Sequence, residues 1–96
     1  MITIASKRNL LEIGNLCGRI YRKVSGAPMC FIHRKTTAKY IIIKFFVDHL
    51  TITQLDELSA QIKADSLYGD RFVKAINTHR VGREGPEQML LIRFTR

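Results

Sequence analysis

The sequence has no tryptophan, two prolines, two cysteines and no long apolar run. Cys17 and Cys30 form no CxxC pair, and a chain of 96 residues can build a core without disulfides. We therefore expect two reduced thiols, as in the cytosol. The longest apolar stretch, residues 41–47, is interrupted by Lys44 and has the length of a strand, and residues 1–5 are too short for a signal-peptide core. These absences predict a cytoplasmic protein that does not enter a membrane.

Linkers and repeats are also absent. No Gly/Ser-rich, Pro-rich or low-complexity tract interrupts the chain, and no internal sequence repeat is visible. The apolar fraction of 46% and the charged fraction of 25% are ordinary for a globular protein. We expect residues 1–96 to fold as a single domain.

The motifs of common enzymes and metal sites are missing as well. No nucleophile elbow, phosphate loop or carboxylate pair is present, so the sequence predicts no catalytic residue and no cofactor. Cys30 and His33 have ligand-like spacing, but positions i and i+3 of a strand point to opposite faces. Cys17, His49 and His79 are scattered along the chain. We predict no metal site and expect a protein that is not an enzyme.

One catalytic alternative stays open. His79 with Arg80, Arg83 and Glu84 or Glu87 supplies the groups of a metal-independent ribonuclease. In such an enzyme His and Glu move protons and Arg stabilises phosphate charge. In length and charge the chain is similar to small ribosome-dependent toxin nucleases, although its residues are arranged differently from theirs.

The formal net charge of +8 is unevenly distributed. Residues 1–44 hold nine Lys and Arg against Glu12 alone, and residues 45–70 hold one Lys against five carboxylates. Residues 71–96 hold six Lys and Arg against two Glu. Such a polarised charge distribution predicts a partner with a negative face, which is most commonly nucleic acid and next an acidic protein surface.

Two amphipathic helices are predicted. Behind a possible N-cap at Ser6, apolar residues recur at helical spacing until the break at residues 25–28: Leu10, Ile13, Cys17, Ile20 and Val24. Gly14 and Gly18 on this helix predict a close approach, most simply by the sheet. A second helix begins at Thr51, with Gln54 completing a capping box, or at Thr53. Its apolar positions are Ile52, Leu55, Leu58 and Ile62.

The remaining segments are rich in β-branched and aromatic residues and predict strands. Residues 1–5 alternate as a short first strand, residues 29–35 and 39–47 form a hairpin, and residues 88–96 form the last strand. Residues expected to face the core are Ile41, Ile43, Phe45, Val47, Leu90, Ile92 and Phe94. Residues 71–81 are compatible with either a helix or a strand.

These elements predict an α+β fold with a small antiparallel sheet and two or three helices on one side. The order βαββαβ favours a ferredoxin-like arrangement, with residues 39–47 as a central strand.

The other face of that sheet is the first candidate site. It would present Tyr40, Ile42, Lys44 and Phe46, with His33, Lys35, Met89, Leu91 and Arg93 from neighbouring strands. Aromatic rings among cations suit single-stranded nucleic acid, because rings stack on bases and cations hold phosphates. In outline this face is similar to that of an RNA-recognition motif. Residues 39–47 lack that family's glycines, and residues 1–5 lack its aromatic residue. Alternatively, residues 71–81 or a second copy of the chain covers the face.

The first helix is the second candidate. Together with the following strands it carries the predicted phosphate-binding residues Lys7, Arg8, Arg19, Arg22, Lys23, Arg34, Lys35, Lys39 and Lys44. Lys7 and Arg8 oppose the helix dipole in the first turn, which an anion-binding surface would explain. The alternative is a solvated face that keeps the protein soluble. Further candidates for stacking or for contact with a partner are Tyr40, Phe46 and Tyr68.

The function we predict is nucleic-acid or nucleoprotein binding by occupancy, without chemistry. The rival is an inhibitor that docks on a host macromolecular complex. In size and α+β build the chain resembles small phage proteins that act against host defences, anti-CRISPR inhibitors among them. A homodimer is also compatible with the sequence.

Overall fold

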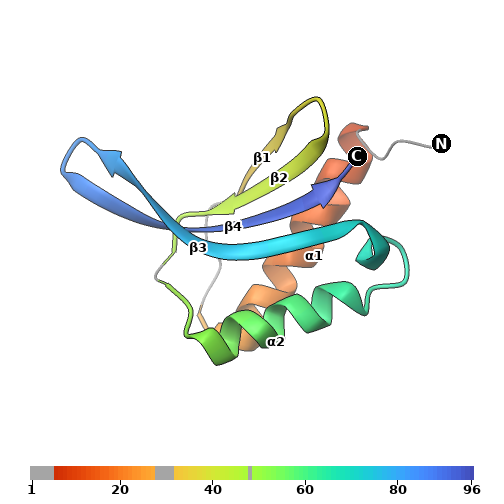
Figure 1. Cartoon of the computed structure of the whole chain (residues 1–96), viewed down its shortest axis with the longest axis horizontal. Helices are drawn as coiled ribbons and strands as arrows, with labels where there is room; N and C mark the ends of the chain where they lie inside the picture. Colours follow the sequence, from red (N-terminus) through yellow and green to blue (C-terminus); the bar gives the residue numbers. More distant parts are fainter. Residues whose placement is uncertain (1–5, 28–31, 48) are drawn as a thin grey trace.

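The computed structural model describes residues 6–27, 32–47 and 49–96. The elements run in the order α1 (Lys7–Ser25), β1 (Ile32–Thr36), β2 (Tyr40–Phe45), α2 (Ile52–Lys63), β3 (Phe72–Gly82) and β4 (Gly85–Thr95). A short 3-10 helix, Gly69–Arg71, precedes β3. Both α-helices lie on one face of a four-stranded antiparallel sheet (Figure 1). The predicted α+β class, the small antiparallel sheet and the helices on one side are confirmed.

Helix α1 begins and ends where the sequence indicates. The Ser6 side chain accepts a hydrogen bond from the Asn9 backbone N–H (3.1 Å), which caps one of the free amides of the first turn. At the other end Gly26 has a φ of 73°, a left-handed conformation that favours glycine, and its N–H donates to the Arg22 carbonyl. The predicted core positions Ile13 and Cys17 are fully buried.

Helix α2 begins at the first of its two predicted starts. The Gln54 N–H donates to Thr51 Oγ1 (3.1 Å), and the Thr51 N–H donates to Gln54 Oε1 (3.0 Å), which completes the capping box. Leu58 and Ile62 are fully buried, as predicted. The prediction for Ile52 is wrong, because this side chain is 81% exposed in the first position of the helix.

The two glycines of α1 are explained by β1, as predicted from their spacing. A Cβ on Gly18 would lie 2.9 Å from the Ile32 side chain. A Cβ on Gly14 would overlap the Arg34 guanidinium, which lies against the helix backbone. The glycines therefore form a shallow groove on α1 that receives the inward side chains of β1.

Residues 71–81, which the sequence left undecided, form strand β3 after a single residue of the 3-10 helix. β3 pairs with β4 from Phe72↔Phe94 to Gly82↔Gly85, so the two strands make one long hairpin. β2 pairs with β4 only between Tyr40↔Thr95 and Phe45↔Leu90. Beyond Leu90 the hairpin therefore continues as a two-stranded ribbon, which projects past the sheet in Figure 1.

The strand order of the sheet is β1-β2-β4-β3, and the ferredoxin-like order βαββαβ is not confirmed. The first strand of that prediction, residues 1–5, lies outside the described residues. In the structure β4 pairs with β2 on the side away from β1. Two strands, β3 and β4, follow α2, whereas the ferredoxin-like order requires only one strand there. The central position of β2 is as predicted.

The described elements repeat the unit helix–strand–strand. α1, β1 and β2 form the first unit, α2, β3 and β4 form the second, and the last strands of both units pair at the centre of the sheet. The repeat is one of arrangement and not of sequence. It places both helices on the same face, and the core between that face and the helices contains the fully buried residues Ile41, Ile43, Phe45, Leu90, Ile92 and Phe94.

Candidate nucleic-acid interface

The sheet has a second face that neither helix covers. Because strand residues alternate between faces, the side chains that alternate with the buried ones point to this side. We call it the open face; its strands carry His33, Lys35, Tyr40, Ile42, Lys44, Lys74, Ile76, Thr78, Arg80, Glu87, Met89, Leu91, Arg93 and Thr95. Phe46 follows β2 directly and joins this face through its contact with Arg80. Residues 72–82 are a strand of the same sheet and do not fold over this face.

The centre of the open face is apolar. Ile42, Ile76 and Leu91 are half-buried on three neighbouring strands, with Ile76 opposite Leu91 and Ile42 diagonal to it, and Met89 is buried. Cations surround this floor: Lys35 and Lys74 are exposed, and Lys44 is half-buried. The face therefore combines an apolar floor with a positive rim.

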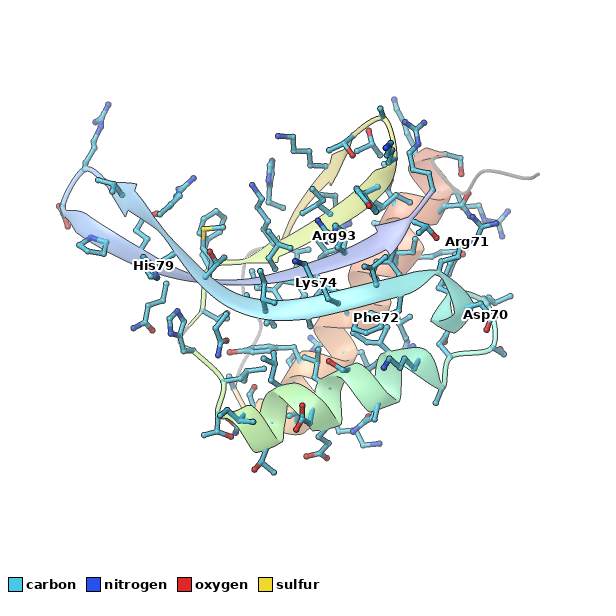
Figure 2. All side chains as sticks on the ribbon, viewed as in Figure 1. Asp70, Arg71, Phe72, Lys74, His79 and Arg93 are labelled. Atoms are coloured by element: carbon cyan, nitrogen blue, oxygen red, sulfur yellow. The ribbon has the colours of Figure 1, made fainter. Side chains whose placement is uncertain are left out.

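Arg93 and Tyr40 form a stack at one end of the floor. The guanidinium carbon of Arg93 lies 4.5 Å from the centre of the Tyr40 ring. Its Nε is buried and has no hydrogen-bond partner among the described residues. Lys74 lies directly opposite Arg93 in the strand register, and Figure 2 shows the two residues on neighbouring strands. Two like charges in directly opposed positions repel each other and destabilise a sheet, and a bound anion would relieve this repulsion.

Arg80 and Phe46 form a second stack at the other end of the floor. The Arg80 guanidinium carbon lies 4.6 Å from the centre of the Phe46 ring, and its Nε donates to Glu87 Oε2 (2.7 Å). A groove of about 740 Å³ lies here, lined by Phe46, Val47, Arg80, Pro86, Glu87 and Gln88. Glu87 is the one carboxylate among the described residues of the open face, and Arg80 neutralises it.

The predicted site residues do not form one surface. Lys35 and Lys44 lie on the open face with Tyr40 and Phe46. The cations of α1 are exposed on the outward side of that helix, which is turned away from the sheet: Lys7, Arg8, Arg19, Arg22 and Lys23. Lys39 is exposed in the turn between β1 and β2.

Arg34 was predicted to act together with Lys35, and the structure separates them. Adjacent strand residues point to opposite faces, and Arg34 points toward α1. Its Nε donates to the Leu10 carbonyl (3.1 Å), and its Nη2 donates to Asn15 Oδ1 (3.3 Å). Arg34 thus joins β1 to α1 through the groove at Gly14.

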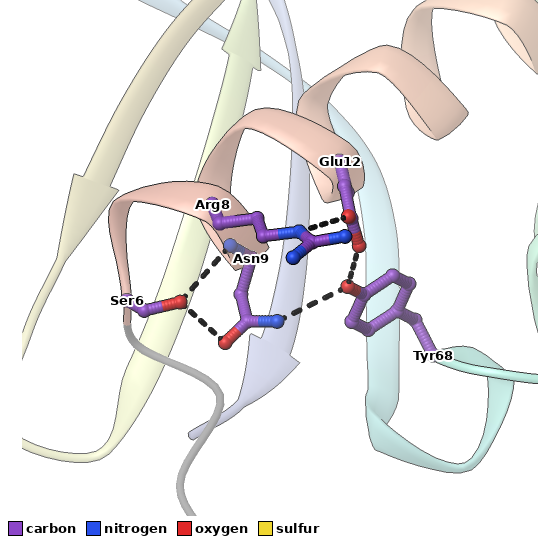
Figure 3. A network of polar contacts seen from close by, with 5 residues as sticks. All are labelled: Ser6, Arg8, Asn9, Glu12 and Tyr68. Carbon is purple, nitrogen blue, oxygen red and sulfur yellow. Dashed lines mark hydrogen bonds and ion pairs between the residues drawn. The ribbon is translucent and has the colours of Figure 1, made fainter.

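Tyr68 was predicted as a contact for a partner, but its side chain is 6% exposed. Its hydroxyl donates to Glu12 Oε2 (2.5 Å) and accepts from Asn9 Nδ2 (3.2 Å), as Figure 3 shows. The hydrogen bond from Tyr68, and then that from Arg8, lowers the pKa of Glu12. Burial, and then the hydrogen bond to Glu12, raises the pKa of Tyr68. This network fastens the segment before β3 to α1.

Four of the possible ribonuclease residues, Arg80, Arg83, Glu84 and Glu87, line one hollow of about 460 Å³ on the β3–β4 hairpin, whereas His79 does not line it. His79 and Arg80 point to opposite faces of the ribbon, and Arg80 is paired with Glu87. The His79 ring lies 6.3 Å from the His49 ring, whose Nε2 is 3.0 Å from the Thr78 carbonyl. Within the described ranges, no three His, Cys, Asp or Glu side chains gather as a metal site requires.

Cys17 is a free thiol in the core, and burial raises its pKa. Cys30 lies outside the described residues. In the part of the chain that the structure describes, neither helix is long and apolar enough to cross a membrane.

Lys74 and Arg80 are the cations of the open face that sequence reasoning did not assign to it. The missed signal is the alternation of Lys74, Ile76, Thr78 and Arg80, which places two cations on one face only if residues 71–81 form a strand.

Comparison with known proteins finds no family model, no curated protein and no solved structure that matches the chain.

Proposed function

We propose that this protein binds nucleic acid through the open face of its sheet and acts by occupancy, without chemistry. The observation that carries the proposal is Lys74 opposite Arg93, with Lys44 diagonal to Arg93 on the neighbouring strand, on a face whose single described carboxylate is already paired. A phosphate backbone supplies negatively charged partners for these cations. The reduced, buried Cys17 is consistent with work in the cytoplasm.

The apolar floor and the two stacks define how bases would be held. Tyr40 and Phe46 each carry a guanidinium on one ring face, so the flat surface offered to a base is that of Arg93 or Arg80. Guanidinium planes, like aromatic rings, stack on unpaired bases. Ile42, Ile76 and Leu91 add apolar contact without hydrogen-bond groups, so weak sequence preference is expected.

A symmetric dimer through the open face is disfavoured by charge. A two-fold interface brings the same patch of both copies together. Here both copies would present the face that carries Lys44, Lys74 and Arg93, so two positively charged surfaces would meet. Self-repulsion therefore favours an anionic partner over a second copy of this chain.

The salt dependence of binding tests the proposal. If Lys35, Lys44, Lys74 and Arg93 each contact one phosphate, affinity for a duplex falls about 150-fold between about 50 and 200 mM salt. For a single strand the same four contacts give a fall of about 50-fold. Fluorescence anisotropy with labelled oligonucleotides measures both. Absence of binding at about 50 mM salt, or an affinity independent of salt, contradicts the proposal.

Docking on an acidic protein surface is the second candidate function. The observation that favours it is the pair of stacks, Arg93 on Tyr40 and Arg80 on Phe46. Arg and Tyr are enriched among the few residues that dominate protein–protein binding energy. The face has the anatomy of such an interface, with an apolar centre at Leu91 and a polar rim. Binding to a partner would then depend on Tyr40 and Arg93 and would survive nuclease treatment, whereas loss of every partner after nuclease supports the first candidate.

A further inference from the structure

A second basic surface lies on the outward side of α1. Arg8, Arg19 and Arg22 are exposed there, and their spacings of eleven and three residues bring them to the same side of a helix. Ile13 and Cys17, on the opposite side, are fully buried. From Arg8 to Lys23 the helix rises about 22 Å, enough to follow several phosphates of a backbone.

This surface is poorly neutralised by the protein itself. The first turn of α1 contains no acidic residue, although Lys7 and Arg8 there oppose the helix dipole. Glu12 is the one carboxylate of α1, and it is already engaged by Arg8 (3.1 Å) and by Tyr68. Asp65 lines the same hollow as Arg19, but within the described ranges no ion pair joins a carboxylate to Arg19, Arg22 or Lys23. Their positive charge is therefore available to an external anion.

The outward side of α1 and the open face point in opposite directions. A helix with its side chains is about 10–12 Å across, and α1 lies between the two surfaces. The Debye length at physiological salt is about 8 Å, so charges on the two surfaces act separately. A straight duplex on the open face does not reach Arg19 or Arg22.

We infer that the outward side of α1 is a second phosphate-binding surface, and that one copy of the chain bridges two segments of nucleic acid. The inference rests on the proposed function, because the open face holds the first segment. The second segment is bound by its backbone alone, since the outward side of α1 offers Leu11 and Asn15 between the cations but no aromatic ring.

A bridging assay tests this inference. A short biotinylated DNA duplex is fixed on beads, and a fluorescent duplex of unrelated sequence is added with or without the protein. We expect the natural chain to capture the fluorescent duplex, and excess protein to abolish capture, because each duplex then binds a separate copy.

Two variants with the same change in net charge distinguish the surfaces. Arg19→Glu/Arg22→Glu is expected to reduce capture at least about tenfold while changing affinity for a single duplex less than about threefold. Lys44→Glu/Lys74→Glu is expected to weaken the binding of a single duplex itself. Arg19→Gln/Arg22→Gln repeats the first test without adding negative charge, and thermal unfolding checks each fold.

Three results would overturn the inference. The natural chain binds one duplex but captures no second one, or capture is unchanged in Arg19→Glu/Arg22→Glu. The third result is that the protein sediments as a dimer before nucleic acid is added, because the two open faces of a dimer would then explain bridging without α1. A failure to bind even the first duplex contradicts the proposed function as well, and is thereby distinguished from a failure of bridging alone.

Discussion

The guanidinium carbon of Arg93 lies 4.5 Å from the centre of the Tyr40 ring, while its buried Nε has no hydrogen-bond partner among the described residues. The ring contributes about 0.5–1 kcal/mol of cation–π attraction at such a site. An unsatisfied buried donor costs about 1–3 kcal/mol, and the opposed Lys74 adds repulsion. These contacts do not account for Arg93 as a stabilising residue, and the proposed binding role supplies another reason for its position.

Replacing Arg93 with an apolar side chain of similar length is therefore expected to separate stability from binding. Arg93→Met should leave the free energy of unfolding unchanged or raise it by up to about 2 kcal/mol, because the unpaired donor is removed. The same variant should weaken nucleic-acid binding. Urea unfolding and anisotropy measure the two effects, and a loss of stability with unchanged binding would refute this account of Arg93.

The effect of Gly14→Ala on the free energy of unfolding is expected to change sign when the Arg34 side chain is removed. In the natural chain, Gly14→Ala should lower the free energy of unfolding, since the new Cβ displaces the Arg34 guanidinium from Leu10 and Asn15. In an Arg34→Ala background, Gly14→Ala should raise it by about 1 kcal/mol, the helix propensity of Ala over Gly. A double-mutant cycle measures the coupling, and additive effects would show that Arg34 does not occupy the groove.

Tyr68→Phe tests the network with Glu12 through its dependence on pH. The pKa of Glu12 is lowered in the folded state, so its stabilisation is complete above the ordinary value of 4.5 and is lost as the pH falls through the folded value. The variant should have a lower Tm than the natural chain at neutral pH. That difference should shrink under acid conditions below pH 4.5, and a difference constant with pH would argue against the hydrogen bond.

Cys17 should react with alkylating reagents only when the protein unfolds. It is fully buried, and the raised pKa of its thiol disfavours the reactive thiolate. We expect mass spectrometry to find two alkylated cysteines after denaturation without reductant, and protection of Cys17 in the native protein. A cysteine pair that reacts only after reduction would instead indicate a disulfide.

The helices and the faces of the central strands could be predicted because their signals are local. Caps at Ser6 and Thr51 and the alternation around Ile41–Ile43 depend on residues close in the sequence. The identity of β3 is not a local property. Residues 71–81 have no decisive period of their own, and the pairing with β4 makes them a strand.

The candidate site was predictable only in part for the same reason. Lys44 and Tyr40 follow from the alternation of one strand, whereas Lys74 joins them only through the strand order β2-β4-β3. The prediction from the sequence grouped Arg34 with Lys35 by charge, although the alternation of strand residues alone puts them on opposite faces. Tyr68 is buried in the core, and its hydroxyl is bonded to α1; both depend on contacts distant in the sequence, which no local pattern predicts.

The nucleic-acid affinity of two variants, each with one reversed charge, tests the central claim most directly. Lys44→Glu on the open face and Lys63→Glu on α2 make the same change in net charge, and Lys63 lies on the other side of the sheet. The account predicts that Lys44→Glu weakens nucleic-acid binding at least about fivefold and reduces the salt slope by about one. Lys63→Glu should change affinity less than about twofold at physiological salt. Equal losses from both reversals, or no loss from Lys44→Glu, would contradict binding through the open face.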